Sequence, residues 1–378
     1  SQRKAFLEFA ARKPQIRLFD MKPRWLTNAV EWDISTLDSL NRLQYYRDTE
    51  WKECNEETTN RFSAVAFAFG QMLSDSLQVP VGLILNAIGG SPAEAWIDRK
   101  TLEFEFPDIL YDWKQNNFIQ DWARERAALN IRKSTNKQQR HPYEPCYLYE
   151  SGIQPLEKFP IRGIIWYQGE SNISNYQFYA PMMTAMVQLW RNVWEDPAMP
   201  FYYVQIAPHK YKDSRDTGAA LLREAQMEAL KTIPNSGIVP TTDIGDEFCI
   251  HPPQKDVVGL RLATLALTKT YGIGRLPSNG PMMTKVDYED NKAIVTFNNA
   301  PAGLFPTFAQ LEGFEIAGAD KKFYPAKAKI IGRTNTVEVS SEEVAQPVAV
   351  RYAFRNYVGN ITLRNTFGLS AFPFRTDT

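Results

Sequence analysis

The feature that most constrains the fold of this chain is an alternation between short apolar runs and segments with helical spacing of apolar residues. The apolar runs contain little polar alternation, so they predict strands that are buried on both faces. The predicted strands occupy residues 16–20, 79–90, 161–171, 200–209 and 236–246. The predicted helical segments are 60–78, 100–145 with a polar linker at its end, 179–196, 220–233 and 254–272. Such strands joined by helices indicate an α/β fold with a doubly wound parallel sheet.

The pattern changes near Gly280. Short runs with alternating apolar residues follow, separated by turns rich in Gly, Asn and Pro. This texture is typical of antiparallel strands and predicts a small all-β, sandwich-like domain. Gly and Pro cluster at 272–281, so we expect one domain over 1–275 and a second over 280–378.

Charge and cysteine content exclude several classes of function. The chain of 378 residues has 43 basic and 43 acidic side chains, so it has no bulk attraction for nucleic acid or an anionic membrane. Its three cysteines have no CxxC spacing, which disfavours a disulfide scaffold and a zinc knuckle. There is neither a GxGxxG after a strand nor a GxxxxGK[ST] loop, so we expect no nucleotide cofactor. No apolar run reaches 18 residues, so we expect no membrane-spanning helix.

Two predicted strands end in small and polar residues, where a parallel sheet of this kind places its ligands. In LNAIGGSPAEAW (85–96), Gly90 can bring a backbone N–H close to a ligand, although a plain strand-to-helix turn has the same composition. In IIWYQGESN (164–172), the amide of Gln168 or Asn172 can donate to a developing oxyanion, and Glu170 can orient its neighbours. The alternative for this second stretch is a polar loop that caps a helix.

His251 is the best candidate for a general base. It lies between the last predicted strand and the last predicted helix, with Asp243, Asp246 and Glu247 just before it. An imidazole there can accept a proton at neutral pH when an acid orients it. The other two histidines, at 141 and 209, occupy less distinctive positions. The spacing gives no helical pair of metal ligands, so we expect no metal site.

A nucleophile is harder to find. The chain has no GxSxG elbow, and Ser91 and Ser171 each lie in a motif with another role.

Taken in order, the motifs VGLILNAIGGSPAEAW, IRGIIWYQGESN and CIHPPQK resemble the sialate O-acetylesterases, which are SGNH-type hydrolases on a flavodoxin-like sheet. The tail from 311 onward is similar to the C-terminal β-region of that family. The resemblance implies that Gly90 supplies an oxyanion N–H and that Gln168 or Asn172 completes the hole. It also implies that Glu170 supports the hole and that His251 is the catalytic histidine.

The sequence departs from the family pattern in two places. The family's nucleophile is the serine of a GQSN block on the first strand, and no such block occurs in these residues. We therefore expect a nucleophile upstream of these residues and a nearly inactive chain without it. Many relatives have an Asp two residues before the histidine, where this chain has Cys249, and the DxxH spacing of the wider superfamily falls on Phe248. The orienting acid stays open among the three carboxylates named above, or the site is a Ser–His dyad.

The resemblance implies a serine-histidine carbohydrate esterase that removes O-acetyl groups from sialic acid or a related sugar. The alternatives are an acetylesterase for xylan or another glycan, and a non-catalytic carbohydrate-binding protein. The expected partner is an O-acetylated carbohydrate, without cofactor or metal. The resemblance also implies a periplasmic or secreted protein, and the sequence makes no prediction of oligomeric state.

Overall fold

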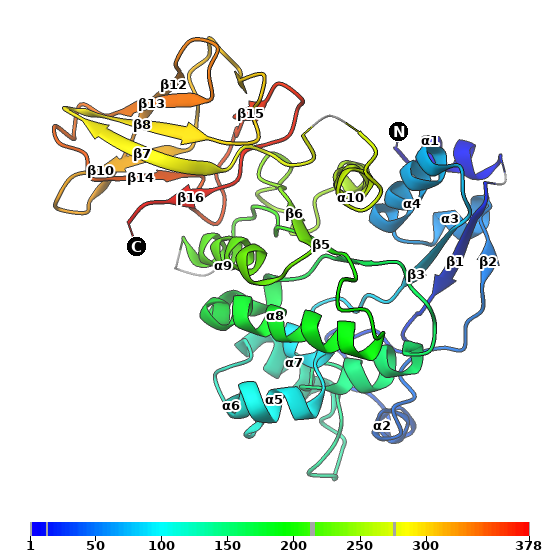
Figure 1. Ribbon diagram of the computed structural model, residues 1–378. Helices are drawn as coiled ribbons and strands as arrows, with labels where there is room; N and C mark the ends of the chain where they lie inside the picture. The colour runs from blue at the N-terminus through cyan, green and yellow to red at the C-terminus, as the bar shows by residue number, and fades with distance from the viewer. Residues whose placement is uncertain (1, 13, 212–215, 275–276, 378) are drawn as a thin grey trace. The chain divides into compact units, whose positions relative to one another are not determined.

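The computed structural model describes residues 2–12, 14–211, 216–274 and 277–377 (Figure 1). Two compact units share the chain. The first comprises Ser1–Tyr202, Glu228–Gly237 and Lys255–Ala263, and the second comprises Tyr203–Met227, Ile238–Gln254 and Thr264–Thr378. No helix among the described residues is long and apolar enough to cross a membrane.

The α/β class predicted for the N-terminal part is confirmed. Its strands are β1 (Ile16–Asp20), β2 (Lys52–Glu53), β3 (Val81–Leu85), β4 (Ile164–Trp166), β5 (Phe201–Val204) and β6 (Ser236–Val239). Its α-helices are α1 (Gln2–Ala10), α2 (Ile34–Asn41), α3 (Glu56–Asn60), α4 (Ala64–Leu77), α5 (Arg99–Glu105), α6 (Pro107–Leu110), α7 (Asp121–Asn130), α8 (Tyr176–Val193), α9 (Gly218–Thr232) and α10 (Lys255–Lys269). Short helical turns are η1 (Ala93–Trp96), η2 (Tyr149–Ile153), η3 (Gln154–Leu156) and η4 (Glu170–Asn175).

The strands of this part fall into two three-stranded sheets, in the orders β2-β1-β3 and β4-β5-β6. β1 and β3 are parallel, with Ile16 opposite Val81 and Asp20 opposite Leu85. The two-residue β2 adds to β1 in the antiparallel direction, which the sequence does not predict because it has no apolar pattern. All four residues of β5 and of β6 are buried, as expected for strands covered on both faces.

In the first unit, α1 and α4 cover the apolar side of β1 and β3. Phe67 of α4 packs edge-to-face against Phe6 and Phe9 of α1, with ring centroids 5.3 and 6.1 Å apart. Leu18 and Leu83 from the two parallel strands join this cluster. The packing holds the carboxyl end of β3, and therefore the loop that follows it, in a fixed position.

The antiparallel β-region predicted for the C-terminal part is confirmed. Its strands are β7 (Met283–Glu289), β8 (Lys292–Phe297), β9 (Leu304–Phe305), β10 (Phe314–Ala317), β11 (Phe323–Pro325), β12 (Lys327–Ile330), β13 (Thr336–Ser340), β14 (Ala349–Tyr352), β15 (Arg364–Asn365) and β16 (Phe374–Arg375). They form four-stranded sheets in the orders β11-β10-β14-β16 and β12-β13-β8-β7, and a pair β15-β9.

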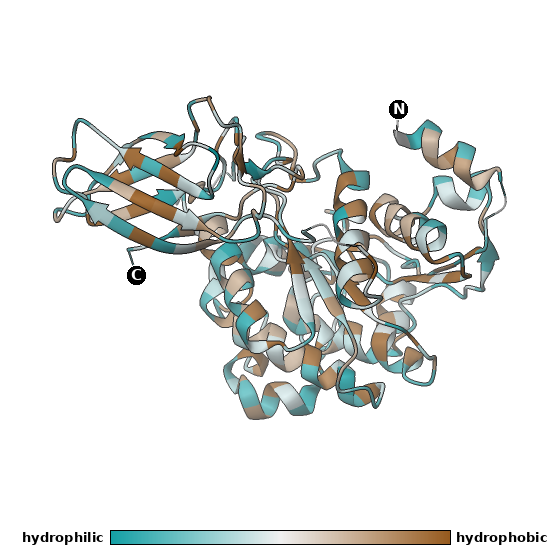
Figure 2. Cartoon of the chain, turned by 45° about the horizontal axis from the view of Figure 1, so that its top comes forward, coloured by the Kyte–Doolittle hydropathy of each residue, from teal (hydrophilic) through white to brown (hydrophobic). Residues whose placement is uncertain are grey.

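The two four-stranded sheets share one apolar core, as in a sandwich. Val295 of β8 and Val337 of β13 come from one sheet, and Ile316 of β10 and Val350 of β14 come from the other; all four are fully buried. Along β8 and β13, buried residues alternate with partly exposed ones. Figure 2 shows hydrophobic and hydrophilic residues interspersed along the strands of the C-terminal region.

The predicted boundary at 272–281 includes residues 275 and 276, which lie outside the described residues. By contacts, the segments Tyr203–Met227 and Ile238–Gln254 belong to the same unit as the C-terminal strands. The division into 1–275 and 280–378 therefore stays a prediction about two successive folds along the chain.

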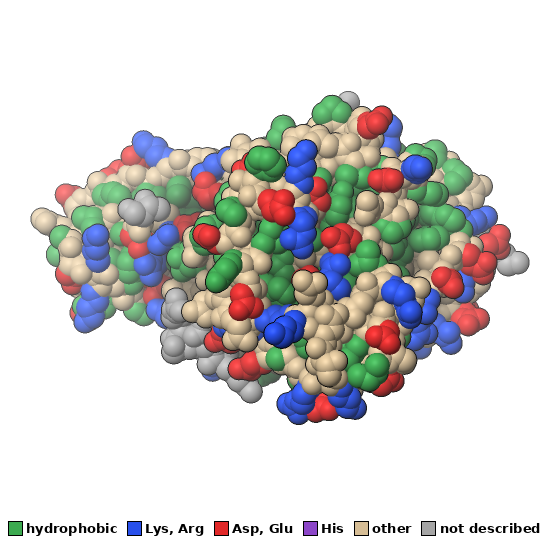
Figure 3. Space-filling view, turned by 90° about the horizontal axis from the view of Figure 1, so that it is seen from below, with side chains coloured by type: hydrophobic (Ala, Val, Ile, Leu, Met, Phe, Trp, Pro, Cys, Tyr) green, Lys and Arg blue, Asp and Glu red, His purple; other side chains and the backbone are tan. Residues whose placement is uncertain are grey.

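Figure 3 shows acidic and basic side chains interspersed on the face it presents, as the balanced charge leads one to expect.

Candidate active site

Gly90 lies in the loop after β3 and presents its backbone to solvent. Its φ is +75°, and a Cβ built there would lie 2.5 Å from the Tyr143 hydroxyl oxygen and 2.8 Å from Cη2 of Trp122. Only glycine fits this position, because both the backbone conformation and the space exclude a side chain. Its N–H donates to no acceptor among the described residues. A backbone N–H without a protein acceptor, on an exposed glycine, is suited to hold a negative oxygen.

The turn after β4 is bonded directly to this loop. Ser171 donates from its hydroxyl to the carbonyl oxygen of Gly90 at 2.9 Å. Gln168 donates from Nε2 to the carbonyl oxygen of Ser91 at 3.1 Å. The structure therefore brings together the two motifs that the sequence singles out, although about 80 residues separate them.

Gln168 is firmly held in this junction. Its Nε2 also donates to Oδ1 of Asn172 at 2.7 Å, and its Oε1 accepts from the Tyr179 hydroxyl at 3.0 Å. Both N–H groups of the amide thus meet protein acceptors. In this arrangement Gln168 fixes the two loops to one another, and donation to a reacting oxygen requires one of these bonds to be released.

Asn172 is fully buried and is bonded on both sides of its amide. Its Oδ1 also accepts from the backbone N–H of Ala93 at 3.0 Å. Its Nδ2 donates to Oε2 of Glu94 at 2.8 Å and to Oδ1 of Asn175 at 3.2 Å. These contacts make Asn172 the centre of the junction, at a distance from solvent.

Glu94 is a member of the site that sequence reasoning missed. It is fully buried in η1, and its Oε1 has no hydrogen-bond partner among the described residues. Burial raises the pKa of this carboxyl to about 7, against the lowering effect of the bond from Asn172. A glutamate within the otherwise small and apolar stretch SPAEAW was the available signal.

Glu170 begins η4 and is half-buried. Burial raises the pKa of its carboxyl, and the nearby ammonium of Lys255 opposes this. Its carbonyl oxygen accepts from Nε2 of Gln120 at 3.0 Å. Lys255 also stands 5.5 Å from the ring centroid of Tyr167, so a cation lies beside this end of β4.

Ser91 and Ser171 are both buried, and both hydroxyls are used in the fold. Ser91 donates to the carbonyl oxygen of Ile88 at 2.8 Å and accepts from Nε1 of Trp96 at 3.0 Å. Ser171 makes the bond to Gly90 described above. These bonds indicate that the two serines stabilise the fold of their loops.

His251 lies in the second unit, in the exposed loop between β6 and α10. The loop is shaped by Asp246, whose Oδ1 accepts from the backbone N–H groups of Phe248 and Cys249, each at 2.8 Å. These two bonds lower the pKa of the Asp246 carboxyl. The thiol of Cys249 donates to the carbonyl oxygen of His251 at 3.2 Å. The cysteine therefore contacts the backbone of the histidine.

The other two candidate acids differ in their surroundings. Glu247 pairs with Lys210 at 3.0 Å. Asp243 is exposed. Burial raises the pKa of the Tyr352 phenol, and the nearby charge of Asp243 raises it further. All three carboxylates stay candidates for the partner of the histidine.

The other two histidines pack against aromatic side chains. His141 is fully buried and stacks on Trp32 at 5.2 Å, and its Nδ1 accepts from the backbone N–H of Tyr143 at 2.9 Å. Burial lowers the pKa of its imidazole to about 3, so this ring is neutral at ordinary pH. His209 packs edge-to-face on Tyr211 at 4.9 Å.

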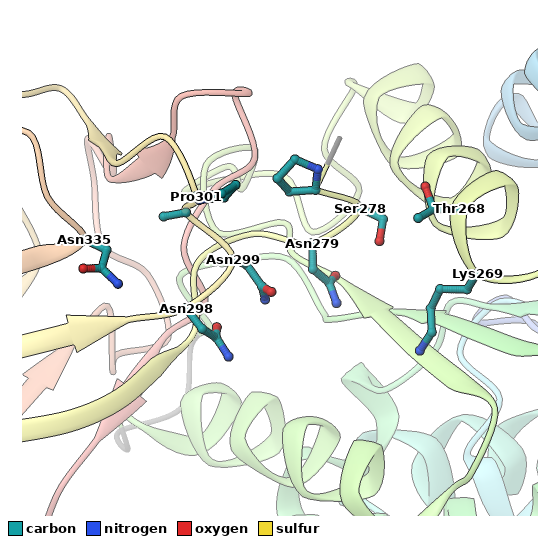
Figure 4. A pocket seen from close by; sticks show the side chains of 10 residues that line it. Thr268, Lys269, Ser278, Asn279, Asn298, Asn299, Pro301 and Asn335 are labelled. Carbon is teal, nitrogen blue, oxygen red and sulfur yellow. The ribbon is translucent and has the colours of Figure 1, made fainter. Parts of the chain in front are cut away.

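A cavity of 650 Å³ lies in the second unit, and none of the predicted site residues lines it (Figure 4). Its wall is rich in amides, and several of them serve the local turns. Asn299 donates to the carbonyl oxygen of Gly280 at 3.1 Å, and Asn335 donates to that of Phe297 at 2.6 Å. No group of three or more metal-ligating side chains occurs in the part of the chain that the structure describes.

The α/β fold with its C-terminal antiparallel region is that of the SGNH-type carbohydrate esterases. Residues 25–268 match the family described as carbohydrate esterase, sialic acid-specific acetylesterase, and the chain belongs to that family.

Individual proteins that are similar to this chain have names that fit the same family. The chain is 28% identical to mouse sialate O-acetylesterase over 326 residues, which cover 78% of this chain and 59% of the mouse protein. It is 28% identical to the human sialate O-acetylesterase over 270 residues, covering 66% of this chain and 48% of that protein. The chain thus spans less than two thirds of these relatives. A crystal structure of a carbohydrate acetylesterase from Xanthomonas citri superposes with a TM-score of 0.78 at 31% identity, covering 100% of this chain and 76% of that one.

Proposed function

We propose that this chain provides the histidine base and the oxyanion-binding loop of a carbohydrate esterase that hydrolyses O-acetyl groups on sialic acid or related sugars. The observation that carries the proposal is the exposed Gly90, whose N–H has no acceptor among the described residues and whose loop is bonded to the turn after β4. Family membership supports the same chemistry.

In the proposed reaction, a serine from residues outside this sequence attacks the acetyl carbonyl carbon. His251 takes the hydroxyl proton and passes it to the sugar oxygen as the C–O bond to the acetyl group breaks. A water molecule then attacks the acetyl-enzyme, with His251 again accepting a proton, and acetate leaves as the serine is re-formed. The N–H of Gly90 donates to the oxyanion in both tetrahedral intermediates.

The remaining site residues have positioning roles in this account. Gln168 and Asn172 hold the two loops so that the Gly90 N–H keeps its direction, and Glu94 fixes Asn172 from behind. Gln168 becomes a second donor if its bond to Ser91 yields to the substrate oxygen. Glu170 keeps the start of η4 in place through its carbonyl bond to Gln120.

The experiment measures acetate release from an O-acetylated sialic acid and from an acetylated xylo-oligosaccharide. Two proteins are compared: the 378-residue chain, and a longer protein with the residues encoded just upstream. We expect turnover in the longer protein and almost none in the shorter one. Turnover by the shorter chain that Ser91→Ala or Ser171→Ala abolishes would move the nucleophile to that serine, and no turnover by either protein would refute the proposed function.

A second candidate, an acetylesterase for xylan or another neutral glycan, is kept because the similar Xanthomonas citri protein is described only as a carbohydrate acetylesterase. The substrate pair above separates the two. We also propose that the protein acts in the periplasm or outside the cell, where surface glycans occur, and fractionation of the source cells checks this.

A further inference from the structure

One face of α7 brings an aromatic ring and a cation to the same side of the helix. Ala123 and Ala127 are buried and turn the helix toward the core. Trp122 and Arg126 lie four residues apart beside that buried face, so their side chains are neighbours on the helix surface. The indole is 38% exposed and Arg126 is half-buried. The sequence predicts helical structure over 100–145, which includes α7, but it does not single out these two residues.

Trp122 stands against the proposed oxyanion loop. Its Cη2 is the atom that a Cβ at Gly90 would approach to 2.8 Å. The ring packs edge-to-face on Tyr143, with centroids 5.9 Å apart. Nε1 donates to Oε1 of Gln120 at 2.8 Å, and Nε2 of Gln120 donates to the carbonyl oxygen of Glu170 at 3.0 Å. Both loops of the candidate site thus fix the ring, and part of it still faces solvent.

Arg126 lies close to the same loop through Thr27. Its Nη1 donates to the carbonyl oxygen of Thr27 at 2.8 Å. The hydroxyl of Thr27 is 2.8 Å from that of Tyr143, which is in turn 2.9 Å from the carbonyl oxygen of Gly89. Burial raises the pKa of Tyr143, and the charge of Arg126 opposes that rise.

No carboxylate of the described residues forms an ion pair with Arg126, and Thr27 is the acceptor of its one hydrogen bond there. A half-buried guanidinium without a counter-ion retains N–H groups that can bind an anion from outside. Its planar fork matches a carboxylate, and the bond to Thr27 fixes its orientation in advance.

We propose that Trp122 and Arg126 form a sugar-binding subsite beside Gly90 that selects acidic O-acetylated sugars. The exposed indole face packs on the C–H face of the sugar ring, and the guanidinium pairs with the sugar carboxylate. This inference rests on the proposed function, and it explains how the same site favours sialic acid over a neutral glycan.

The test uses the longer protein with the upstream residues and two substrates that differ in one charge: an O-acetylated sialic acid and its carboxyl methyl ester. Acetate release gives kcat/KM for each. We expect the wild-type protein to prefer the acid, and Arg126→Gln to lower the acid-to-ester ratio about 10- to 100-fold, as for loss of a hydrogen bond to a charged group. Arg126→Lys retains part of the preference. Arg132→Gln, which removes an exposed cation just after the same helix, leaves the ratio unchanged.

Trp122→Ala raises KM for both sugar esters more than for p-nitrophenyl acetate, and Trp122→Phe restores most of the difference. Trp51→Ala is the matched control, because that indole is 37% exposed and packs on Phe19 and Phe159 instead.

An acid-to-ester ratio near one in the wild-type protein, or one that Arg126→Gln leaves unchanged, overturns the subsite while the esterase stands. Absence of acetate release from every substrate by the wild-type protein refutes the proposed function instead.

Discussion

Replacing Glu94 with Gln tests the buried centre of the candidate site. In the folded chain the carboxyl is fully buried, and Asn172 is its hydrogen-bond partner on one oxygen. Its pKa is raised from 4.5 to about 7. Such a rise corresponds to a difference of about 3 kcal/mol between the two protonation states.

The sign of the pH dependence follows from proton uptake. Between about pH 4.5 and 7 the folded chain holds a proton on Glu94 that the unfolded chain has lost. The free energy of unfolding therefore falls by about 3 kcal/mol as the pH rises through this window, and the loss is complete above it. The Gln side chain does not titrate, so Glu94→Gln lacks this contribution. Its buried amide lacks one partner at every pH, which adds a constant cost of about 1–3 kcal/mol.

The assay is urea unfolding of both proteins at several values between pH 4.5 and 8. We expect the stability of Glu94→Gln relative to wild type to improve by about 3 kcal/mol across that range. Glu103→Gln is the control, because Glu103 is exposed and has only a helical neighbour as its ion pair. If the free energies of unfolding of wild type and Glu94→Gln change in parallel with pH, the claim that Glu94 holds a proton in the folded chain is wrong.

Two further predictions concern the fold around the same loop. Gly90→Ala should lower the free energy of unfolding by about 1–3 kcal/mol and weaken acetate release, because the Cβ overlaps Tyr143 and Trp122 at a positive φ; wild-type thermal stability in this variant would contradict the geometry. His141 is neutral in the fold because burial lowers its pKa to about 3, so stability should be lost as the pH falls from about 6.5 toward 3. His141→Asn cannot be protonated and should lose less stability over that range, whereas an equal loss would place the acid sensitivity elsewhere.

The sequence predicts the class of fold because the information is local. Residues 81–85 form a short apolar strand, and the two glycines at 89 and 90 mark where the backbone must turn closely. The C-terminal strands are equally visible, since short apolar runs such as β8 and the alternating β13 are separated by turn residues. β2 is the counterexample, because its two charged residues join the sheet only through pairing with β1.

The candidate site is less predictable because its contacts are distant in sequence. The motif around Gln168 and Asn172 shows that amides are present, but not that both are committed to bonds within the protein. Those commitments depend on Glu94, 78 residues before Asn172. Likewise, Trp122 gains its place from Gly90 and Glu170, which no local pattern on α7 reveals.

The most direct measurement of the central claim is the rate of acetate release from an O-acetylated sialic acid by the longer protein, with and without the substitution His251→Ala. We expect kcat/KM to fall about 10⁴-fold or more, because a serine without its base retains only the contribution of the oxyanion hole and binding. Circular dichroism should show the fold unchanged, since His251 is exposed. Turnover within tenfold of wild type in a folded His251→Ala protein would contradict the account.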